Sequence, residues 1–164
     1  VRLMQEGGAK MVKLEGGASQ VAIVEFLANH DIAVCAHLGL KPQSVHKAGG
    51  FRVQGRQDDA AEQMRRDAKA LEQAGADLVL LECIPSALGA QITSELSVPV
   101  IGIGAGPETD GQILVLYDLL DITSGRKPKF SRNFMAGLDS PLQAIKNYVS
   151  AVRDKTYPAP EHCF

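Results

Sequence analysis

The sequence lacks the patterns that mark several common classes of protein. No apolar run approaches about 18 residues, and the N-terminus has neither a basic region nor a cleavage pattern, which argues against a membrane-spanning helix and a secretory signal. An excess of one charge sign is also missing. The formal net charge is −2, so there is no electrostatic case for binding to nucleic acid or to an anionic membrane. These absences predict a soluble, cytoplasmic protein.

Cysteine is scarce and unpaired. Cys35, Cys83 and Cys163 are odd in number, lie far apart and show no Cys-x-x-Cys spacing, which argues against a disulfide framework and a structural zinc site. Low-complexity segments and sequence repeats are absent as well. With 164 residues, 45% of them hydrophobic, the chain has enough material for one core, and we expect residues 1–164 to form a single domain.

Apolar segments alternate between strand-like and helical spacing. The spacing predicts strands over 10–15, 32–38, 77–83 and 99–104, and helices over 19–30, 57–74, 86–96 and 141–153. Gly75 is in the position of a helix-terminating glycine, and residues 113–120 fit either a strand or a helix. Because the strands are continuous apolar runs, we expect a parallel sheet that is covered by helices.

Three of these strands end in titratable side chains. Lys13 and Glu15 alternate with apolar residues, so both would lie on one face of a strand, while His37 and Glu82 stand at or near the ends of the next two. Catalytic groups spread over several strand ends favour a (β/α)8 barrel over an open doubly wound sheet. A complete barrel needs about 250 residues, and this chain supplies only about the last five of eight βα units.

The first residues are consistent with an incomplete barrel. Val1 to Glu6 have the pattern of the last turns of a helix, ended by Gly7 and Gly8, with no initiating Met. A covered parallel sheet that is cut open exposes apolar faces and a strand edge. Our hypothesis is that an N-terminal portion with about three strands is absent or is supplied by another chain.

Five segments, in this order, resemble those of the ketopantoate hydroxymethyltransferase family, and the resemblance extends over nearly the whole chain. They are Val12-Lys13-Leu14-Glu15-Gly16-Gly17; His37-Leu38-Gly39-Leu40 with Pro42-Gln43-Ser44-Val45; Gly49-Gly50-Phe51-Arg52-Val53-Gln54-Gly55-Arg56; Leu81-Glu82-Cys83-Ile84-Pro85; and Gly102-Ile103-Gly104-Ala105-Gly106. The resemblance implies a (β/α)8 barrel of the phosphoenolpyruvate/pyruvate-like type, with upstream metal-binding aspartates for which this chain has no equivalent. Lys41, Tyr117 and Asp121 depart from the residues common in the family.

The resemblance also implies a reaction of pantothenate and coenzyme A biosynthesis. A hydroxymethyltransferase of this kind uses Mg²⁺, takes a one-carbon unit from 5,10-methylenetetrahydrofolate and joins it to 3-methyl-2-oxobutanoate, giving 2-dehydropantoate. It implies a large homo-oligomer, commonly a decamer. By the same resemblance Glu15 is a ligand of the metal, Lys13 contacts the oxo acid and Glu82 is the general base. His37 would bind the substrate carboxylate or orient a water of the metal shell.

Other interpretations remain open at this point. Lys13 and Glu15 could simply pair with each other or across the sheet, and Glu82 could pair with a neighbouring Lys or Arg. His37 could be a hydrogen-bonded core residue. The glycines of 102–106 do not match a dinucleotide loop, and they indicate either a close approach to substrate or a tight turn. In the polar loop 39–56, Arg52 and Arg56 could cover an anionic substrate or be solvated. Two alternatives for the function remain. The protein could be a related Mg²⁺-dependent oxo-acid lyase or mutase, or the chain could be a non-catalytic fragment.

Overall fold

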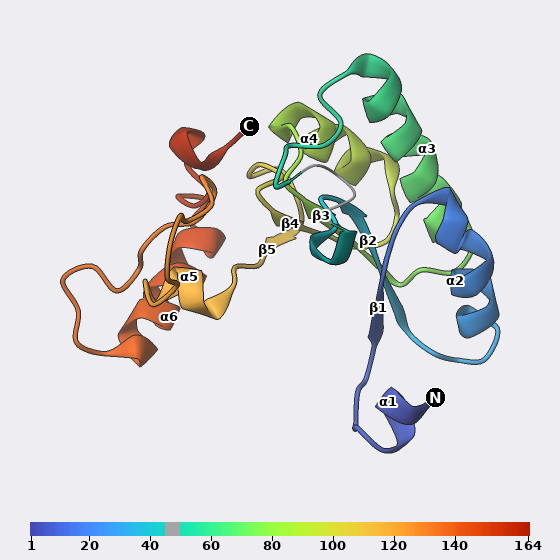
Figure 1. Ribbon diagram of the computed structural model, residues 1–164, viewed down its shortest axis with the longest axis horizontal. Coiled ribbons are helices and arrows are strands. Elements are labelled where there is room, and N and C mark those ends of the chain that lie inside the picture. The colour runs from blue at the N-terminus through green and yellow to red at the C-terminus, as the bar shows by residue number, and fades with distance from the viewer. Residues whose placement is uncertain (45–49) are drawn as a thin grey trace.

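The computed structural model describes residues 1–44 and 50–164, and its centre is a five-stranded parallel sheet (Figure 1). Val45 and Gly49, which belong to the family-like segments, lie outside the described residues. The strands are β1 (Val12–Glu15), β2 (Val34–Gly39), β3 (Leu78–Glu82), β4 (Val100–Ile103) and β5 (Gly111–Gln112). They follow one another in chain order, and every neighbouring pair is parallel.

The strand order confirms the fold class expected from the sequence. In a doubly wound sheet the order reverses at a switch point, whereas consecutive βα units of a barrel place each strand beside the one before it. Here the sheet runs β1-β2-β3-β4-β5 without a reversal and stays open. The chain therefore has the architecture of part of a (β/α)8 barrel.

Helices follow the strands as predicted, with small differences in their bounds. They are α1 (Arg2–Gln5), α2 (Val21–Ala28), α3 (Asp58–Gln73), α4 (Ser86–Glu95), α5 (Leu116–Leu119) and α6 (Pro141–Arg153), with 3-10 turns η1 (Ala18–Gln20), η2 (Pro42–Ser44) and η3 (Pro160–His162). Helix α3 ends before Gly75, whose φ of +98° is the left-handed conformation that glycine tolerates best. The ambiguous segment 113–120 contains only the single helical turn α5.

The two faces of the sheet have different partners, as strand alternation requires. Val12, Leu14 and Leu38 face the helices and belong to the larger core cluster, which also contains Leu71 of α3 and Ile92 of α4. The opposite face carries a second cluster, formed by Cys35, Leu40, Leu80, Cys83, Ile103 and Phe130. In a barrel this second face would be the interior, and it is the face on which the charged strand ends lie.

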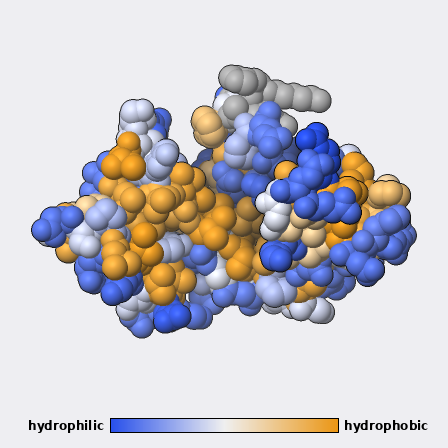
Figure 2. All heavy atoms as spheres, turned by 90° about the horizontal axis from the view of Figure 1, so that it is seen from below, coloured by the Kyte–Doolittle hydropathy of each residue, from blue (hydrophilic) through white to orange (hydrophobic). Residues whose placement is uncertain are grey.

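Helices α5 and α6 lie beside β5, at the end of the sheet away from β1 (Figure 1). Ser140 caps α6, with Pro141 in the first turn, and Phe134 and Tyr157 pack against its buried side. Several large apolar side chains here stay exposed, among them Leu116, Ile145 and Val149. Figure 2 shows broad hydrophobic areas on the face of the molecule seen from below. No helix in the described part of the chain is long and apolar enough to span a membrane.

Candidate active site

Strands β1, β2 and β3 bring all four residues singled out from the sequence to one edge of the sheet. Glu15 lies opposite His37 in the β1–β2 register, and Glu82 lies opposite Gly39, two residues beyond His37, in the β2–β3 register. Because side chains alternate along a strand, Lys13, Glu15, His37 and Glu82 share the inner face. Carboxyl ends of parallel strands form the edge at which α/β enzymes bind their ligands.

His37 lies between the two carboxylates. Its Nε2 atom is 3.2 Å from Glu82 Oε2, and its Nδ1 atom is 3.6 Å from Glu15 Oε1. The imidazole side chain is 0% exposed, whereas the Glu15 and Glu82 side chains are 12% and 15% exposed. A neutral imidazole donates through one ring nitrogen, and a protonated one donates through both. The histidine is therefore placed to orient the two carboxylates relative to each other.

Hydrogen bonding within this cluster is incomplete. Glu15 Oε2 and both ring nitrogens of His37 are buried, and within residues 1–44 and 50–164 none of them has a partner with hydrogen-bond geometry. Buried polar groups are nearly always satisfied, so these atoms call for a partner such as a water, an ion or a ligand. The interpretation of His37 as a fully hydrogen-bonded core residue does not agree with this geometry.

Lys13 stands at the outer side of the cluster. Its Nζ atom is 4.0 Å from Glu15 Oε1, at the limit of an ion pair, and its side chain is 48% exposed. A contact of this kind between partly exposed groups contributes little to stability. The ammonium group is thus free to contact an anionic ligand at the mouth while it stays close to the carboxylate.

A metal site at this edge would be built around Glu15. Its buried, unpartnered Oε2 atom is the kind of hard oxygen donor that Mg²⁺ prefers. Among the described residues there is no group of three or more His, Cys, Asp or Glu side chains that could hold a metal ion by themselves. Glu15 therefore fits as one ligand of a cation whose other ligands come from substrate, water or residues outside this group.

Cys35 and Cys83 belong to the hydrophobic cluster of the inner face, and both are poor nucleophiles. Burial raises the pKa of the Cys35 thiol. Burial, with a smaller contribution from the neighbouring Glu82 carboxylate, raises the pKa of Cys83 to about 11. Because of these raised pKa values, both thiols are protonated near pH 7. The nucleophilic form of cysteine is the thiolate, so neither thiol is reactive. They serve as small apolar residues of the inner-face cluster.

The glycine-rich segment after β4 forms a tight turn. Gly104 has a φ of +63°, and a Cβ atom there would lie 2.5 Å from the Phe130 ring. Gly106 has a φ of +84°, and a Cβ atom there would lie 2.6 Å from the Ser86 Cβ atom. These glycines allow the chain to turn closely past its neighbours, which is one of the two alternatives that the sequence left open. The turn leads to β5 rather than to a helix.

The loop before α3 crosses the carboxyl end of β3. The Gln54 N–H donates to the Cys83 carbonyl at 2.9 Å, which holds this part of the loop beside the Glu82 strand end. Arg52 and Arg56 are exposed, and neither forms an ion pair with another described residue. Their role in binding an anion remains a prediction. Residues 45–49 of the same loop lie outside the described residues.

Comparison with known proteins identifies the family that this chain resembles. A family model described as ketopantoate hydroxymethyltransferase matches residues 1–160. The chain is 60% identical over 163 residues to the 3-methyl-2-oxobutanoate hydroxymethyltransferase of Alkalilimnicola ehrlichii and covers 59% of that protein. It is 59% identical to the protein of that name from Halorhodospira halophila, covering 59% of it, and 55% identical to the one from Ralstonia nicotianae, covering 60%. These alignments include 99%, 99% and 100% of this chain. The chain thus spans about three-fifths of the length of these curated relatives.

Proposed function

This chain belongs to the ketopantoate hydroxymethyltransferase family, and from that membership we propose that its protein transfers a hydroxymethyl group from 5,10-methylenetetrahydrofolate to 3-methyl-2-oxobutanoate. The product would be 2-dehydropantoate, a step of pantothenate biosynthesis. The observation that carries the proposal is the cluster of Lys13, Glu15, His37 and Glu82 at one sheet edge. At the place where a small oxo acid would bind, Glu82 supplies a base, Lys13 supplies a cation, and Glu15 supplies an oxygen atom without a hydrogen-bond partner.

The first step is removal of a proton from C3 of the oxo acid. Glu82 is the base, because its carboxylate lies at the strand end, where His37 Nε2 is 3.2 Å from its Oε2 atom. The C3–H bond breaks, Glu82 takes the proton, and the electron pair passes into an enolate. Lys13 offsets the negative charge of the substrate carboxylate and of the enolate. A positioned general base accelerates such a step by roughly 10²- to 10⁴-fold.

The second step forms the carbon–carbon bond. Water releases the one-carbon unit as formaldehyde by breaking its two C–N bonds, and both folate nitrogens take up hydrogen. The nucleophilic C3 atom then attacks the formaldehyde carbon, and the new alkoxide takes back the proton from Glu82 to become a hydroxymethyl group. One water is consumed overall, since that carbon gains a hydroxyl group while tetrahydrofolate leaves. Exclusion of bulk water by the apolar inner face around Leu80 and Ile103 would protect the enolate from being protonated again.

Mg²⁺ belongs to the proposal as the ion that Glu15 would help to hold. When bound, it would supply Lewis-acid polarisation of the substrate oxygens, an effect worth on the order of several kcal/mol. Calorimetric titration of the full-length gene product with Mg²⁺ tests this assignment without any turnover. Glu15→Gln should weaken Mg²⁺ binding, and Glu6→Gln, an exposed carboxylate change outside the site, should leave it unchanged.

The remaining parts of the proposal concern the whole protein. By resemblance to the family we propose a cytoplasmic homo-oligomer, commonly a decamer, whose partners are its small-molecule substrates rather than nucleic acid or membrane. The net charge of −2 supports the second point, because it provides no general attraction to polyanions.

A single assay tests the activity. The full-length gene product is incubated with Mg²⁺, 3-methyl-2-oxobutanoate and ¹³C-labelled 5,10-methylenetetrahydrofolate, and the products are followed by mass spectrometry. Labelled 2-dehydropantoate that requires the folate supports the proposal. Cleavage or rearrangement of the oxo acid without a folate would instead identify a lyase or a mutase, and the absence of any reaction would identify a non-catalytic protein.

A further inference from the structure

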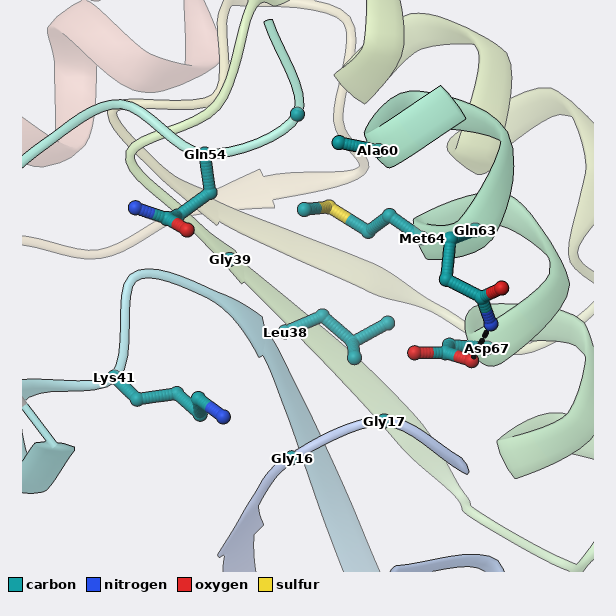
Figure 3. Close-up of a pocket in the computed structure, with 11 residues that line it drawn as sticks. Gly16, Gly17, Leu38, Gly39, Lys41, Gln54, Ala60, Gln63, Met64 and Asp67 are labelled. Carbon is teal, nitrogen blue, oxygen red and sulfur yellow. Dashed lines mark hydrogen bonds between the residues drawn. The ribbon is translucent and has the colours of Figure 1, made fainter. Parts of the chain in front are cut away.

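A cavity lies on the helix-covered side of the same sheet edge (Figure 3). It has a volume of about 250 Å³ and lies between the ends of β1 and β2 and one face of α3. Leu38 lines it, whereas His37 points to the opposite side of the strand, as alternation requires. The cavity is therefore separate from the carboxylate cluster, although both open at the carboxyl edge of the sheet.

Two glycines form the rim that the cavity shares with the active-site edge. Gly16 follows Glu15 directly, and Gly39 lies opposite Glu82 in the β2–β3 register. Gly39 has a φ of +92°, and a Cβ atom there would lie 2.1 Å from the Glu82 carbonyl oxygen. Glycine at both positions keeps this shared rim free of side-chain atoms.

Opposite walls of the cavity carry opposite charges. In Figure 3 the Lys41 ammonium and the Asp67 carboxylate point into the cavity from two sides, with Leu38 and Met64 between them. Across the described residues, Lys41 and Asp67 do not form an ion pair with each other. Asp67 Oδ1 accepts a hydrogen bond from Gln63 Nε2 at 2.7 Å, which orients the carboxylate and leaves Oδ2 facing the cavity.

We propose that this cavity binds the pterin ring of the one-carbon donor. The ring has flat apolar faces for Met64 and Leu38, an amino group and ring N–H donors for Asp67 Oδ2, and a 4-oxo oxygen that Lys41 can reach. The proposal rests on the proposed function, because it names the part of the protein that takes the folate. The cavity is smaller than the roughly 300–1,000 Å³ of a site that encloses a whole drug-sized ligand. It therefore suits one end of the folate, while the rest extends outward.

The position of the transferable carbon supports this assignment. In 5,10-methylenetetrahydrofolate the one-carbon unit bridges two nitrogens at the edge of the pterin. A pterin held against α3 would place that edge near the rim at Gly16 and Gly39. The oxo acid, held beside Lys13 and Glu82, would lie on the other side of this rim.

The test is Asp67→Asn in the full-length gene product, assayed with Mg²⁺. We expect the KM for 5,10-methylenetetrahydrofolate to rise on the order of tenfold, since a hydrogen bond to a charged group is lost. The KM for the oxo acid and the exchange of its C3 proton with D₂O in the absence of folate should not change. Formaldehyde, as a donor without a pterin, should react at the same rate in both proteins.

Two further variants make the result interpretable. Lys41→Met removes the charge from the opposite wall and should also raise the KM for the folate, whereas Asp58→Asn, at the exposed start of the same helix, should not. An unchanged folate KM in both Asp67→Asn and Lys41→Met would overturn the proposal, and the cavity would then only separate α3 from the sheet. Absence of C3 exchange in the unmodified protein would instead overturn the proposed function, and with it this ligand.

Discussion

At the scale of single residues, the structure adds most to the interpretation of His37. The sequence left its role open between the substrate carboxylate and a water of the metal shell. In the structure both of its ring nitrogens face carboxylates, at 3.2 Å and 3.6 Å, and the ring is fully buried. We therefore propose that His37 is a positioning residue that acts through Glu15 and Glu82.

Replacing His37 should affect both stability and the chemical step. His37→Ala removes a fully buried ring that lies between the two carboxylates and leaves a cavity, and we expect a loss of about 2–4 kcal/mol in the free energy of unfolding. The rate of C3 proton exchange should fall at least about tenfold, while the KM for the folate stays unchanged. His37→Asn, which keeps one donor, should restore part of the exchange rate. A normal exchange rate in His37→Ala, measured by NMR in D₂O, would exclude this role.

The sequence could predict which residues belong to the site but not their contacts. The alternation of Lys13 and Glu15 with apolar residues follows from the two-residue period of a strand, so their common face was predictable. The contact of His37 with both carboxylates depends on the register of three strands, which no local pattern contains. Asp67 was missed for a similar reason. It has the spacing of a polar helix residue, and only the glycines at the ends of β1 and β2 leave a cavity in front of it.

At the scale of elements, Glu72 connects α3 to the segment that leads into β4. Its carboxylate accepts hydrogen bonds from Lys69 Nζ at 2.6 Å and from the backbone N–H groups of Ser97 and Val98 at 2.5 Å and 3.3 Å. The Lys69 contact, together with the two backbone donors, lowers the pKa of Glu72. A carboxylate with three donors fixes the position of β4 against the helix layer.

Glu72→Gln should therefore destabilise the protein in a pH-dependent way. Because the folded state lowers the pKa of Glu72, its contribution is present above the ordinary pKa of glutamate and is lost as the pH falls through the lowered value. We expect a loss of about 1 kcal/mol at pH 7, seen as a lower thermal midpoint, and a smaller difference between the two proteins in acid.

The control for this experiment is Glu62→Gln on the same helix. Glu62 pairs with Arg65 on the exposed side, where an ion pair contributes little. The Glu62→Gln substitution should therefore shift the thermal midpoint much less than Glu72→Gln does, both at pH 7 and in acid. An equal shift in both variants, or a Glu72→Gln effect that grows in acid, would contradict the assignment.

Most elements could be predicted, and the exceptions have physical reasons. Continuous apolar runs identified β1 to β4, and helical spacing identified α2, α3, α4 and α6. Strand β5 has only two residues, too few for any period to appear. The segment around α5 shows no clear period, because its apolar residues are not confined to a buried face. Leu116 and Tyr117 are apolar or aromatic but exposed, although α5 packs against α6.

At the scale of the whole molecule, the open sheet and the exposed apolar side chains on α5 and α6 are its main features. We expect the full-length gene product to be a homo-oligomer, as the family resemblance implies. Native mass spectrometry measures this directly, and a mass equal to ten subunits would agree with the expectation. A monomer at micromolar concentration would contradict it.

The central claim is that this sheet edge removes the C3 proton of an oxo acid through Glu82. The most direct test is the exchange of that proton with D₂O, followed by NMR in the full-length gene product with Mg²⁺ and without folate. Glu82→Gln should reduce the exchange rate by roughly 10²- to 10⁴-fold while 3-methyl-2-oxobutanoate still binds. Exchange at the unmodified rate in Glu82→Gln would show that the base lies elsewhere and would contradict the account.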